Sequence, residues 1–524
     1  MTTQYQGYLK LLQQAEHQHV LRGICHGIER EGLRITSESR LSQKTHPEAL
    51  GKALTHPYIT TDYSEALLEF ITPVHSRIED TLRFLSELHQ YNNHYSGNEL
   101  LWAGSMPPIL EGDEQIPIAQ YGHSNIGQMK SVYREGLAHR YGKAMQTIAG
   151  IHYNFSLPEK FWELRLDSSH SSRDLQSFRS EGYLSLIRNF RRYSWLLMYL
   201  FGASPAASKS FFPKTDGNFG LESLGSDTLY SPYGTSLRMS DFGYTNNAQS
   251  NLNICYNTLE EYVDSLTNAI HTPYQPYEHI GLKQEGKYLQ LNTNLLQIEN
   301  EYYSTMRPKR IARSGEKPIT ALRRQGIEYV EVRCLDINPF EPLGLSQLDA
   351  HFQDVFLVYC ALKGDSVLTA GECREVEDNF STVVSEGRKP ELMLTHNQQP
   401  VSLKLWGTQL LDYMLPVAAQ LDQTNETHLF TDSVKAQQSK VDDVALTPSA
   451  QVMAAMERQT MGYVDLVQSL SRQHSEYFHQ QLLSPERLAY FQQVAQRSRV
   501  DQQAREAREE KTFDEFLVDY FTSE

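Results

Sequence analysis

The amino-acid sequence predicts an α+β protein whose sheet joins strands that are not neighbours along the chain. Four short segments are rich in β-branched or aromatic residues and are bounded by Gly, Pro, Asp or Asn, which is typical of strands. These segments are residues 27–35, 66–71, 150–157 and 326–335. Helical stretches and long loops separate them without a regular alternation of one strand and one helix, which favours α+β over a parallel α/β fold.

Two amphipathic or apolar stretches predict helices. In residues 76–91, Ser76 and Glu79 have the spacing of a capping box, and a stripe of Ile and Leu side chains follows at helical spacing. Residues 180–201 form the second helix, which Gly202 ends. Its apolar end is far shorter than the roughly 20 residues of a membrane span, so we expect it in the core. Between the two helices we expect strands and polar loops.

The last third of the chain differs in character from the first two thirds. Ser484, with a proline after it, is expected to open the last long helix, and the mixed charges of residues 501–511 are expected on its solvated face. Because no Pro/Gly/Ser-rich linker marks a boundary, we predict a single large domain over residues 1–524. Its sheet-bearing region is residues 1–340, and residues 341–524 are mostly helical.

Composition restricts the classes of function. With 48 basic and 64 acidic residues, the 524-residue chain has a net charge of −16, which argues against general affinity for nucleic acid or an anionic membrane. The five cysteines are scattered without a CxxC pair, as expected of free thiols in a reducing compartment. The N-terminus has no basic start followed by an apolar core, so we expect a cytoplasmic protein without a secretory signal.

Charged side chains occupy both faces of the first predicted strand, which is unusual for a core strand. Residues two apart on a strand share a face, so Glu29 and Glu31 lie together. Arg30 and Arg34 lie on the opposite face. A single glutamate on a strand is often a solvent-facing residue or a salt-bridge partner, and this alternative stays open for each of them.

The other three predicted strands also carry polar groups. Glu69 has apolar neighbours, and Asp62 lies at the entry to its strand. His152 lies on the third strand, and Glu331 shares a face with Arg333 on the fourth. Several carboxylates with at most one histidine suit Mg²⁺ or Mn²⁺ and not structural zinc.

Residues 307–324 are strongly basic, with seven Lys or Arg residues against one acid. A positive loop beside a carboxylate–metal cluster suits a polyphosphate that is neutralised from both sides. A solvated loop that keeps the surface soluble is the alternative. No phosphate-binding P-loop is present, because residues 136–143 have one residue too many and Ala144 follows where Ser or Thr is needed.

Seven strings resemble the proteobacterial glutamate-cysteine ligases, also called gamma-glutamylcysteine synthetases. They occur in order between residues 27 and 340, whereas the last third resembles the family only diffusely. The strings are GIEREGLRI, HPEALGKALTHPYITTDYSEALLEFITP, SVYREGLAHRYG, MQTIAGIHYNFSLP, SLRMSDFGYTN, QIENEYYSTMRPKR and GIEYVEVRCLDINPF.

The resemblance implies a reaction and a fold. The reaction is ATP-dependent amide formation between the γ-carboxylate of L-glutamate and the amino group of L-cysteine, through γ-glutamyl phosphate, as the first step of glutathione synthesis. Phosphorylation is needed because a carboxylate is a poor electrophile. The implied fold is a curved, mainly antiparallel sheet wrapped by helices, as in glutamine synthetase and the guanidino kinases.

The resemblance also implies roles for individual residues. The implied Mg²⁺ ligands, with Mn²⁺ possible, are Glu29, Asp62, Glu69, His152 and Glu331. Arg333 and Glu331 are implied as catalytic, and the implied nucleotide contacts are Arg333, Arg310 and Asn300. Tyr133, Tyr244 and Tyr303 match residues that line the cysteine pocket. Arg134, Gln146 and Arg238 are candidates for holding the carboxylates and amines of the amino acids.

Alternatives to this ligase remain open. A related carboxylate–amine ligase would use another amine. A metal-dependent phosphoesterase would also gather carboxylates, but it would need neither the basic segment nor an amino-acid pocket. A helical adaptor built on the last third would not require the first 340 residues. From the resemblance we expect a monomer that binds glutamate, cysteine and ATP, with feedback inhibition by glutathione, and no nucleic acid or membrane partner.

Overall fold

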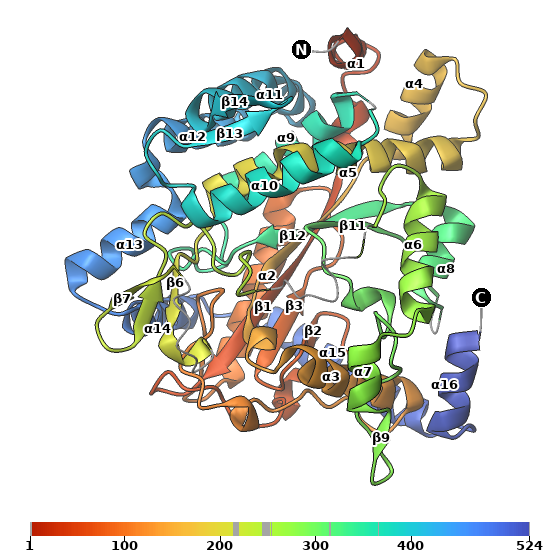
Figure 1. Ribbon diagram of the computed structural model, residues 1–524, viewed down its shortest axis with the longest axis vertical. Coiled ribbons are helices and arrows are strands. Elements are labelled where there is room, and N and C mark those ends of the chain that lie inside the picture. Colours follow the sequence, from red (N-terminus) through yellow and green to blue (C-terminus); the bar gives the residue numbers. More distant parts are fainter. Residues whose placement is uncertain are drawn as a thin grey trace.

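An antiparallel sheet of seven strands forms the centre of the computed structural model (Figure 1). The structure describes residues 3–212, 220–243, 252, 254–313, 316–364 and 366–522. The strand order is β11-β12-β5-β1-β3-β2, and β4 pairs with β1 beyond this path. The strands are β1 (Cys25–Ile35), β2 (Ile59–Thr61), β3 (Leu67–Ile71), β4 (Leu100–Leu101), β5 (Ile151–Ser156), β11 (Met306–Lys309) and β12 (Tyr329–Leu335).

The four strands predicted from the sequence are the four adjacent central strands β12, β5, β1 and β3. Every pair in this sheet is antiparallel, and β12 pairs with β5 across a long stretch of chain. The α+β fold with non-sequential strand pairing is therefore confirmed. The register places Glu29 opposite His152 and Glu31 opposite Glu69, so the polar residues of separate strands fall on one patch.

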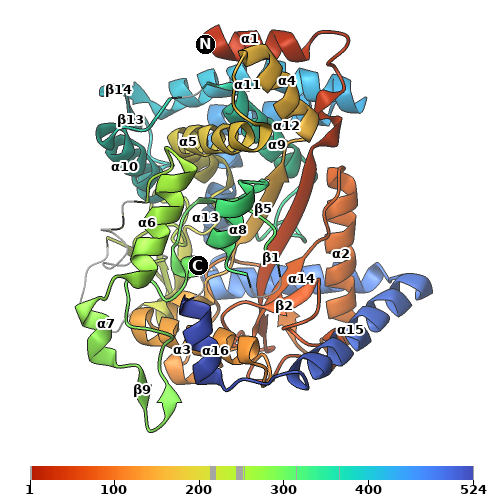
Figure 2. The same ribbon diagram turned by 90° about the vertical axis from the view of Figure 1, so that its right-hand side faces the viewer.

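Helices cover both faces of this sheet. Figure 2 shows α2 and α15 on one side, and α3, α6 and α8 on the other. The helices are α1 (Thr3–Leu12), α2 (Ile78–Tyr95), α3 (Asn125–Tyr141), α4 (Glu159–Ser169), α5 (Leu175–Phe201), α6 (Leu259–His271), α7 (Gln275–Ile280), α8 (Pro318–Gln325), α9 (Gln347–Leu362), α10 (Ala370–Glu386), α11 (Leu403–Asn425), α12 (Leu429–Asp442), α13 (Pro448–Gln459), α14 (Tyr463–Gln480), α15 (Pro485–Glu506) and α16 (Phe513–Thr522).

Short strands outside the central sheet form three small sheets. One has the order β6-β8-β7, and the other two are hairpins. These strands are β6 (Ala206–Ser208), β7 (Glu222–Leu224), β8 (Thr228–Tyr230), β9 (Lys283–Gln284), β10 (Lys287–Tyr288), β13 (Met393–His396) and β14 (Gln399–Ser402).

The predicted capping box of α2 is wrong. The helix begins after Arg77, and no side chain caps it. Glu79 instead accepts a hydrogen bond from Gln347 Nε2 at 3.2 Å, because α9 packs against α2. The Glu79 carboxylate therefore binds a side chain of α9 and does not cap the N-terminus of α2. The helix itself, with its buried Ile and Leu stripe, is confirmed.

Two helices, α3 and α4, lie where strands and polar loops were expected. The inward side of α3 includes Asn125, Gly127, Arg134 and Gly136, all of which are buried. A helix that buries polar groups and glycines shows little hydrophobic periodicity, and periodicity is the signal that sequence reasoning uses. The missed helix lies next to the central sheet and contributes to the site described below.

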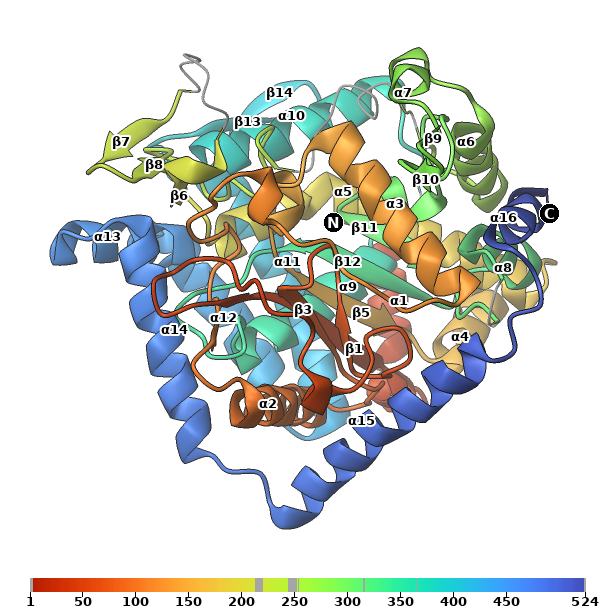
Figure 3. The same cartoon turned by 90° about the horizontal axis from the view of Figure 1, so that it is seen from below.

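The C-terminal helices wrap around the outside of the molecule, as Figure 3 shows for α13 to α16. Ser484 caps α15 as predicted, because its Oγ accepts the N–H of Arg487 at 3.2 Å. The charged run 501–511 is not simply a solvated helix face. Glu506 accepts the N–H of His123, and Glu509 accepts that of Asn125, so the run holds the N-terminus of α3.

The helix α9 is the apolar centre of the fold, and α5, α11 and α12 pack against it. One apolar core continues from Tyr5 to Phe491 through both the sheet region and the helical region. Asp354 of α9 is buried and accepts the hydroxyl proton of Tyr153 at 2.8 Å, while its other oxygen lies 2.7 Å from His26 Nε2. These contacts attach α9 to β5 and β1.

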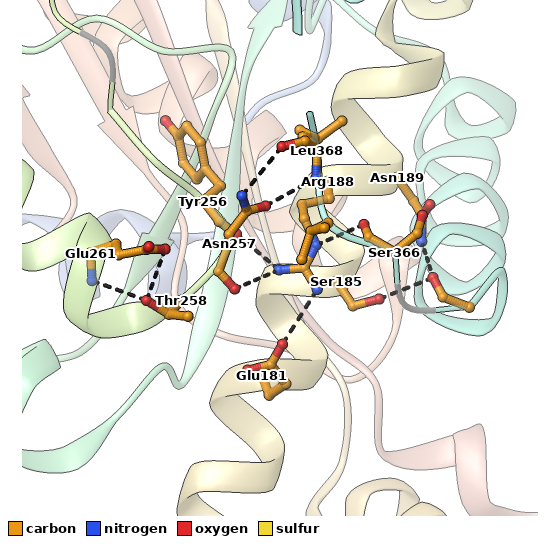
Figure 4. A network of polar contacts seen from close by, with 12 residues as sticks. Glu181, Ser185, Arg188, Asn189, Tyr256, Asn257, Thr258, Glu261, Ser366 and Leu368 are labelled. Atoms are coloured by element: carbon orange, nitrogen blue, oxygen red, sulfur yellow. Dashed lines mark hydrogen bonds and ion pairs between the residues drawn. The ribbon is translucent and has the colours of Figure 1, made fainter. Parts of the chain in front are cut away.

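A buried guanidinium fastens α5 to two loops. Arg188 donates to the carbonyl oxygens of Tyr256 and Asn257 at 2.9 and 3.0 Å, and to that of Ser366 at 3.2 Å (Figure 4). Asn257 in turn exchanges two hydrogen bonds with the backbone of Leu368. The predicted core helix is therefore held at its centre by polar contacts as well as by apolar packing.

The state of the cysteines agrees with the expectation from the sequence. All five cysteines are free thiols, and Cys334 is a buried residue of β12, as predicted. Among the helices that the structure describes, none is both long enough and apolar enough to cross a membrane.

A buried histidine near the sheet predicts a pH dependence of stability. His56 is 5% exposed, and its Nδ1 accepts the N–H groups of Tyr58 and Ile59 at 3.1 and 2.8 Å. Burial lowers the pKa of His56 to about 4. The unfolded chain therefore binds more protons below pH 6.5, so stability is lost as the pH falls from about 6.5 towards 4.

The variant His56→Asn isolates this effect, because an asparagine oxygen can accept the same two N–H groups but does not titrate. From pH 7 to pH 5, we expect the wild type to lose about 2 kcal/mol more free energy of unfolding than the variant. Urea unfolding at both pH values measures this difference. An equal loss in both proteins would contradict the prediction.

Candidate active site

Three neighbouring strands bring two carboxylates and an imidazole together. Oxygen atoms of Glu29 and Glu331 and a nitrogen of His152 lie within 4.8 Å of one another. His152 Nδ1 is 3.1 Å from Glu29 Oε2 and 3.8 Å from Glu331 Oε1. The cluster follows from the strand order, because β5 lies between β1 and β12 and the three side chains project from the same face.

Further carboxylates border this cluster. Glu31 Oε1 is 3.6 Å from His152 Nε2, and Glu31 Oε2 accepts the N–H of Gly150 at 2.6 Å. Glu69 lies opposite Glu31 in the β1–β3 register. Asp62 follows the end of β2 and, with Glu31, lines a cavity. The structure thus groups all five expected metal ligands around one region of the sheet.

The carboxylates of the cluster repel one another, and basic side chains lie beside Glu331. Burial and the charges of Glu29, Asp62 and Glu31 raise the pKa of Glu69 well above its usual value. Burial also raises the pKa of Glu31, and Asp62 adds to this. A divalent cation would remove this repulsion, and the donor set, four or five carboxylates with one imidazole, fits Mg²⁺ or Mn²⁺.

Basic side chains surround Glu331. Lys309 Nζ lies 3.1 Å and Arg333 Nη1 3.2 Å from Glu331 Oε2. Burial alone would raise the pKa of Glu331, but Lys309, Arg333 and His152 outweigh it and hold that pKa well below its usual value. Arg307 is buried opposite Glu331 in the β11–β12 register. The site therefore carries fixed positive charge beside its carboxylates.

A cavity of about 120 Å³ opens next to these groups. Side chains that border the carboxylate cluster, among them Glu31 and Asp62, line it together with side chains from α3 and from the segments around residues 146 and 300. Its lining residues are Glu31, Asp62, Tyr63, Tyr133, Arg134, Leu137, Tyr141, Met145, Gln146, Asn300, Glu301, Tyr303, Arg307 and Arg333. A cavity of acids, bases and tyrosine rings suits a small zwitterion such as an amino acid.

Four of the residues expected to bind substrate line this cavity, namely Tyr133, Arg134, Gln146 and Tyr303. Asn300, expected at the nucleotide, also lines it. Arg134 Nε donates to the carbonyl of Asp62. The missed helix α3 therefore supplies two of the expected substrate contacts and joins them to the carboxylate segment.

Two expected residues, Arg238 and Arg310, do not line this cavity. Arg238 is buried behind the cavity, where its Nη2 donates to the carbonyl of Arg333 at 2.7 Å and its Nη1 is 3.6 Å from Asp336. Arg310 donates to Gln325 and pairs with Glu328, outside the cavity. Tyr244 lies outside the described residues.

The basic segment 307–324 is not one positive loop. It contains most of the strand β11 and of the helix α8, and Lys309, near its start, contacts Glu331 of the carboxylate cluster. Arg323 pairs with Asp264 and Arg324 with Glu316, so the acids that neutralise them come from other parts of the fold or from the same segment.

Sequence reasoning missed residues that shape the cavity. Lys309 was noted only as one base in the run, yet it contacts Glu331. Arg140 and Glu301 form a fully buried ion pair at 2.9 Å, and Tyr141 donates its hydroxyl proton to the same carboxylate. These three residues lie within strings that resemble the family, which was the available signal. Tyr141 and Glu301 are 160 positions apart in the sequence, so local patterns do not predict their contact.

The family model and the similar sequences all match one protein family. A family model described as glutamate-cysteine ligase matches residues 9–383. A glutamate-cysteine ligase of Pseudomonas fluorescens is 52% identical over 515 residues, which cover 98% of this chain and 96% of that protein. One of Pseudomonas aeruginosa is 51% identical over 515 residues, with 98% and 97% covered.

Solved structures agree with the sequence comparisons. The crystal structure of a glutamate-cysteine ligase from Francisella tularensis in complex with AMP superposes with a TM-score of 0.89 at 36% identity. The match covers 95% of this chain and 97% of that one. A bifunctional glutathione synthetase from Pasteurella multocida has a TM-score of 0.74 at 25% identity, with 94% and 58% covered.

Proposed function

The chain belongs to the glutamate-cysteine ligase family, and from this premise we propose how its own residues carry out the reaction. The enzyme joins the γ-carboxylate of L-glutamate to the amino group of L-cysteine at the expense of ATP, in the first step of glutathione synthesis. The observation that carries the proposal is that Glu31 and Arg333, which contact the carboxylate–imidazole cluster, also line a cavity of amino-acid character.

Glu29, Asp62, Glu69, His152 and Glu331 are the residues that would hold Mg²⁺ or Mn²⁺. Their oxygen-rich chemistry and the raised pKa of Glu69 support this assignment. A cation held by these residues would offset the negative charge that develops during phosphoryl transfer.

Arg333 is proposed to contact the phosphoryl group as it moves to the γ-carboxylate of glutamate. Its side chain is 18% exposed and is held by Glu331, so it is oriented before the substrate binds. Lys309 and Arg307 add positive charge on the same side. Asn300 and Arg310 are proposed as nucleotide contacts, with Arg310 turning away from Glu328 when ATP is bound.

Tyr133, Arg134, Gln146 and Tyr303 are proposed to bind the amino-acid substrates, and Tyr244 to complete the cysteine pocket. The cysteine amine attacks the carbonyl carbon of γ-glutamyl phosphate and the amide bond forms. Phosphate leaves with the electron pair of the broken C–O bond and takes up the proton that the amine nitrogen loses. Arg238 is proposed to act as a positioning residue, because it binds the backbone of Arg333.

A coupled assay of ADP release tests the function. With glutamate, Mg²⁺ and ATP present, we expect ADP release only when an amine is added, and faster release with cysteine than with alanine or 2-aminobutyrate. The mixture without glutamate is the control.

ATP hydrolysis that is independent of cysteine would contradict the proposal. Equal rates with all three amines would instead favour the related carboxylate–amine ligase with a different amine substrate. Mass spectrometry of the product separates these outcomes, because each amine gives a γ-glutamyl product of distinct mass.

The proposal also covers the location, the oligomeric state and the inhibition of the enzyme. Five free thiols support a cytoplasmic location, because structural disulfides are rare in that reducing compartment. We further propose a monomer that is inhibited by glutathione, whose γ-glutamylcysteine part resembles the product that leaves the cavity.

A further inference from the structure

A buried guanidinium lies on the face of β1 opposite the carboxylate cluster. Arg30 alternates with Glu29 and Glu31, is 2% exposed, and points towards α2 and α14. A Cβ atom at Gly32 would lie 2.0 Å from Arg30 Nη1, so the guanidinium lies directly over this glycine. The missing side chain of Gly32 thus provides the space that the guanidinium occupies on a buried face of the strand.

This guanidinium has few partners. Within the described part of the chain its Nε and Nη1 have no hydrogen-bond acceptor, and its Nη2 makes one long contact of 3.4 Å with the carbonyl of Trp102. Among the described residues no carboxylate lies within ion-pair distance of Arg30, whereas Arg34, on the same face, pairs with Glu99 at 2.9 Å. A buried charge needs a partner, because its loss of hydration is otherwise uncompensated.

The groups around Arg30 enclose a cavity of about 20 Å³. This is room for an occupant the size of one water molecule. His89 and Asn92 of α2, and Ser471 and His474 of α14, contribute to its lining. His89 is 4% exposed, and its Nε2 also has no hydrogen-bond partner among the residues that the structure describes.

The net charge of the cavity is that of Arg30 alone. Burial, followed by the charges of Arg30 and His474, lowers the pKa of His89 well below its usual value. Burial likewise lowers the pKa of His474, whose Nε2 is 2.8 Å from the carbonyl of Pro339. Both imidazoles are therefore neutral at pH 7, which leaves one positive charge whose Nε and Nη1 have no acceptor among the described residues.

We propose that this cavity binds one monovalent anion of halide size, chloride under physiological conditions, between Arg30 and His89. One negative charge balances the single guanidinium, and the volume excludes phosphate, sulfate and carboxylate groups. A water molecule would fill the space without neutralising the charge. The anion connects β1 with α2 and α14 and so supports the strand whose other face carries Glu29 and Glu31.

Bromide tests the site directly, because it replaces chloride and scatters X-rays anomalously. Crystals of the full-length protein grown without chloride are soaked in sodium bromide. We expect an anomalous peak within 3.5 Å of Arg30 Nη1, at hydrogen-bond distance. No peak in this cavity, while bromide occupies other places in the same crystals, would overturn the proposal.

Thermal unfolding provides a second test that does not depend on crystals. At constant ionic strength, replacing gluconate by chloride or bromide is expected to raise Tm of the wild type by about 2 °C. Arg30→Met is expected to lose this response. Arg472→Met, at an exposed arginine of α14, is the matched control and should keep it.

A response that persists in Arg30→Met would place halide binding elsewhere and overturn the proposal. The bromide crystals decide the question if Arg30→Met does not fold.

Discussion

Replacing Glu331 by Gln is expected to lower kcat by about 10³-fold or more. Glu331 is 1% exposed and is the carboxylate on which Lys309 and Arg333 converge. Glutamine preserves the shape of the side chain but removes the negative charge that a divalent cation needs. It also leaves two cations close together without their shared partner, so both the metal site and the orientation of Arg333 are lost.

Steady-state ADP release at saturating substrates measures this loss, and circular dichroism shows whether the fold is retained. Glu328→Gln is the matched control, because Glu328 lies just before the same strand but is 38% exposed and pairs with Arg310. Its activity should stay within about twofold of the wild type, as is usual for surface charges. A Glu331→Gln enzyme that kept more than a few per cent of the activity would show that the metal assignment is wrong.

Replacing Arg333 by Met is expected to lower kcat by about 10³- to 10⁵-fold, with a much smaller change in KM for ATP. An arginine that acts on the transferring phosphoryl group contributes mainly in the transition state. Burial alone would lower its pKa, but Glu331 beside it raises that pKa, so the guanidinium remains charged throughout the working range.

Lysine at position 333 should restore only part of the activity, because an ammonium group cannot form the paired contacts of a guanidinium. Arg323→Met provides the control, since Arg323 belongs to the same basic segment but is half-exposed and pairs with Asp264. If Arg333→Met raised KM for ATP and left kcat unchanged, Arg333 would be a binding residue and not a catalytic one.

Local patterns predicted much of the sheet. The β-branched runs located β1, β3, β5 and β12, and the two-residue period placed Glu29 with Glu31 and Glu331 with Arg333 on shared faces. Alternation is a property of a single strand, so it is readable without knowledge of the partner strands. Resemblance to a family supplied the roles of these residues, which alternation alone does not contain.

A helix whose inward side is polar was not predicted. The helix α3 buries Asn125, Gly127 and Arg134 against the site, so it lacks the apolar stripe by which helices are found in sequences. The capping box of α2 failed for a related reason, because Glu79 is taken by Gln347 of a distant helix. In both cases a contact between remote segments outweighs a local preference.

By itself the sequence determined the fold class, the family and the strand faces that carry the acids, because composition, periodicity and family strings are properties of continuous segments. Tertiary structure decided which acids meet and which bases neutralise them. The register of β1, β5 and β12 joins Glu29, His152 and Glu331. Strand pairing and burial also decide that Lys309 faces the site while Arg323 faces Asp264. Electrostatic interaction depends on distance in space, and in this fold that distance is set by pairings between residues from separate segments of the chain.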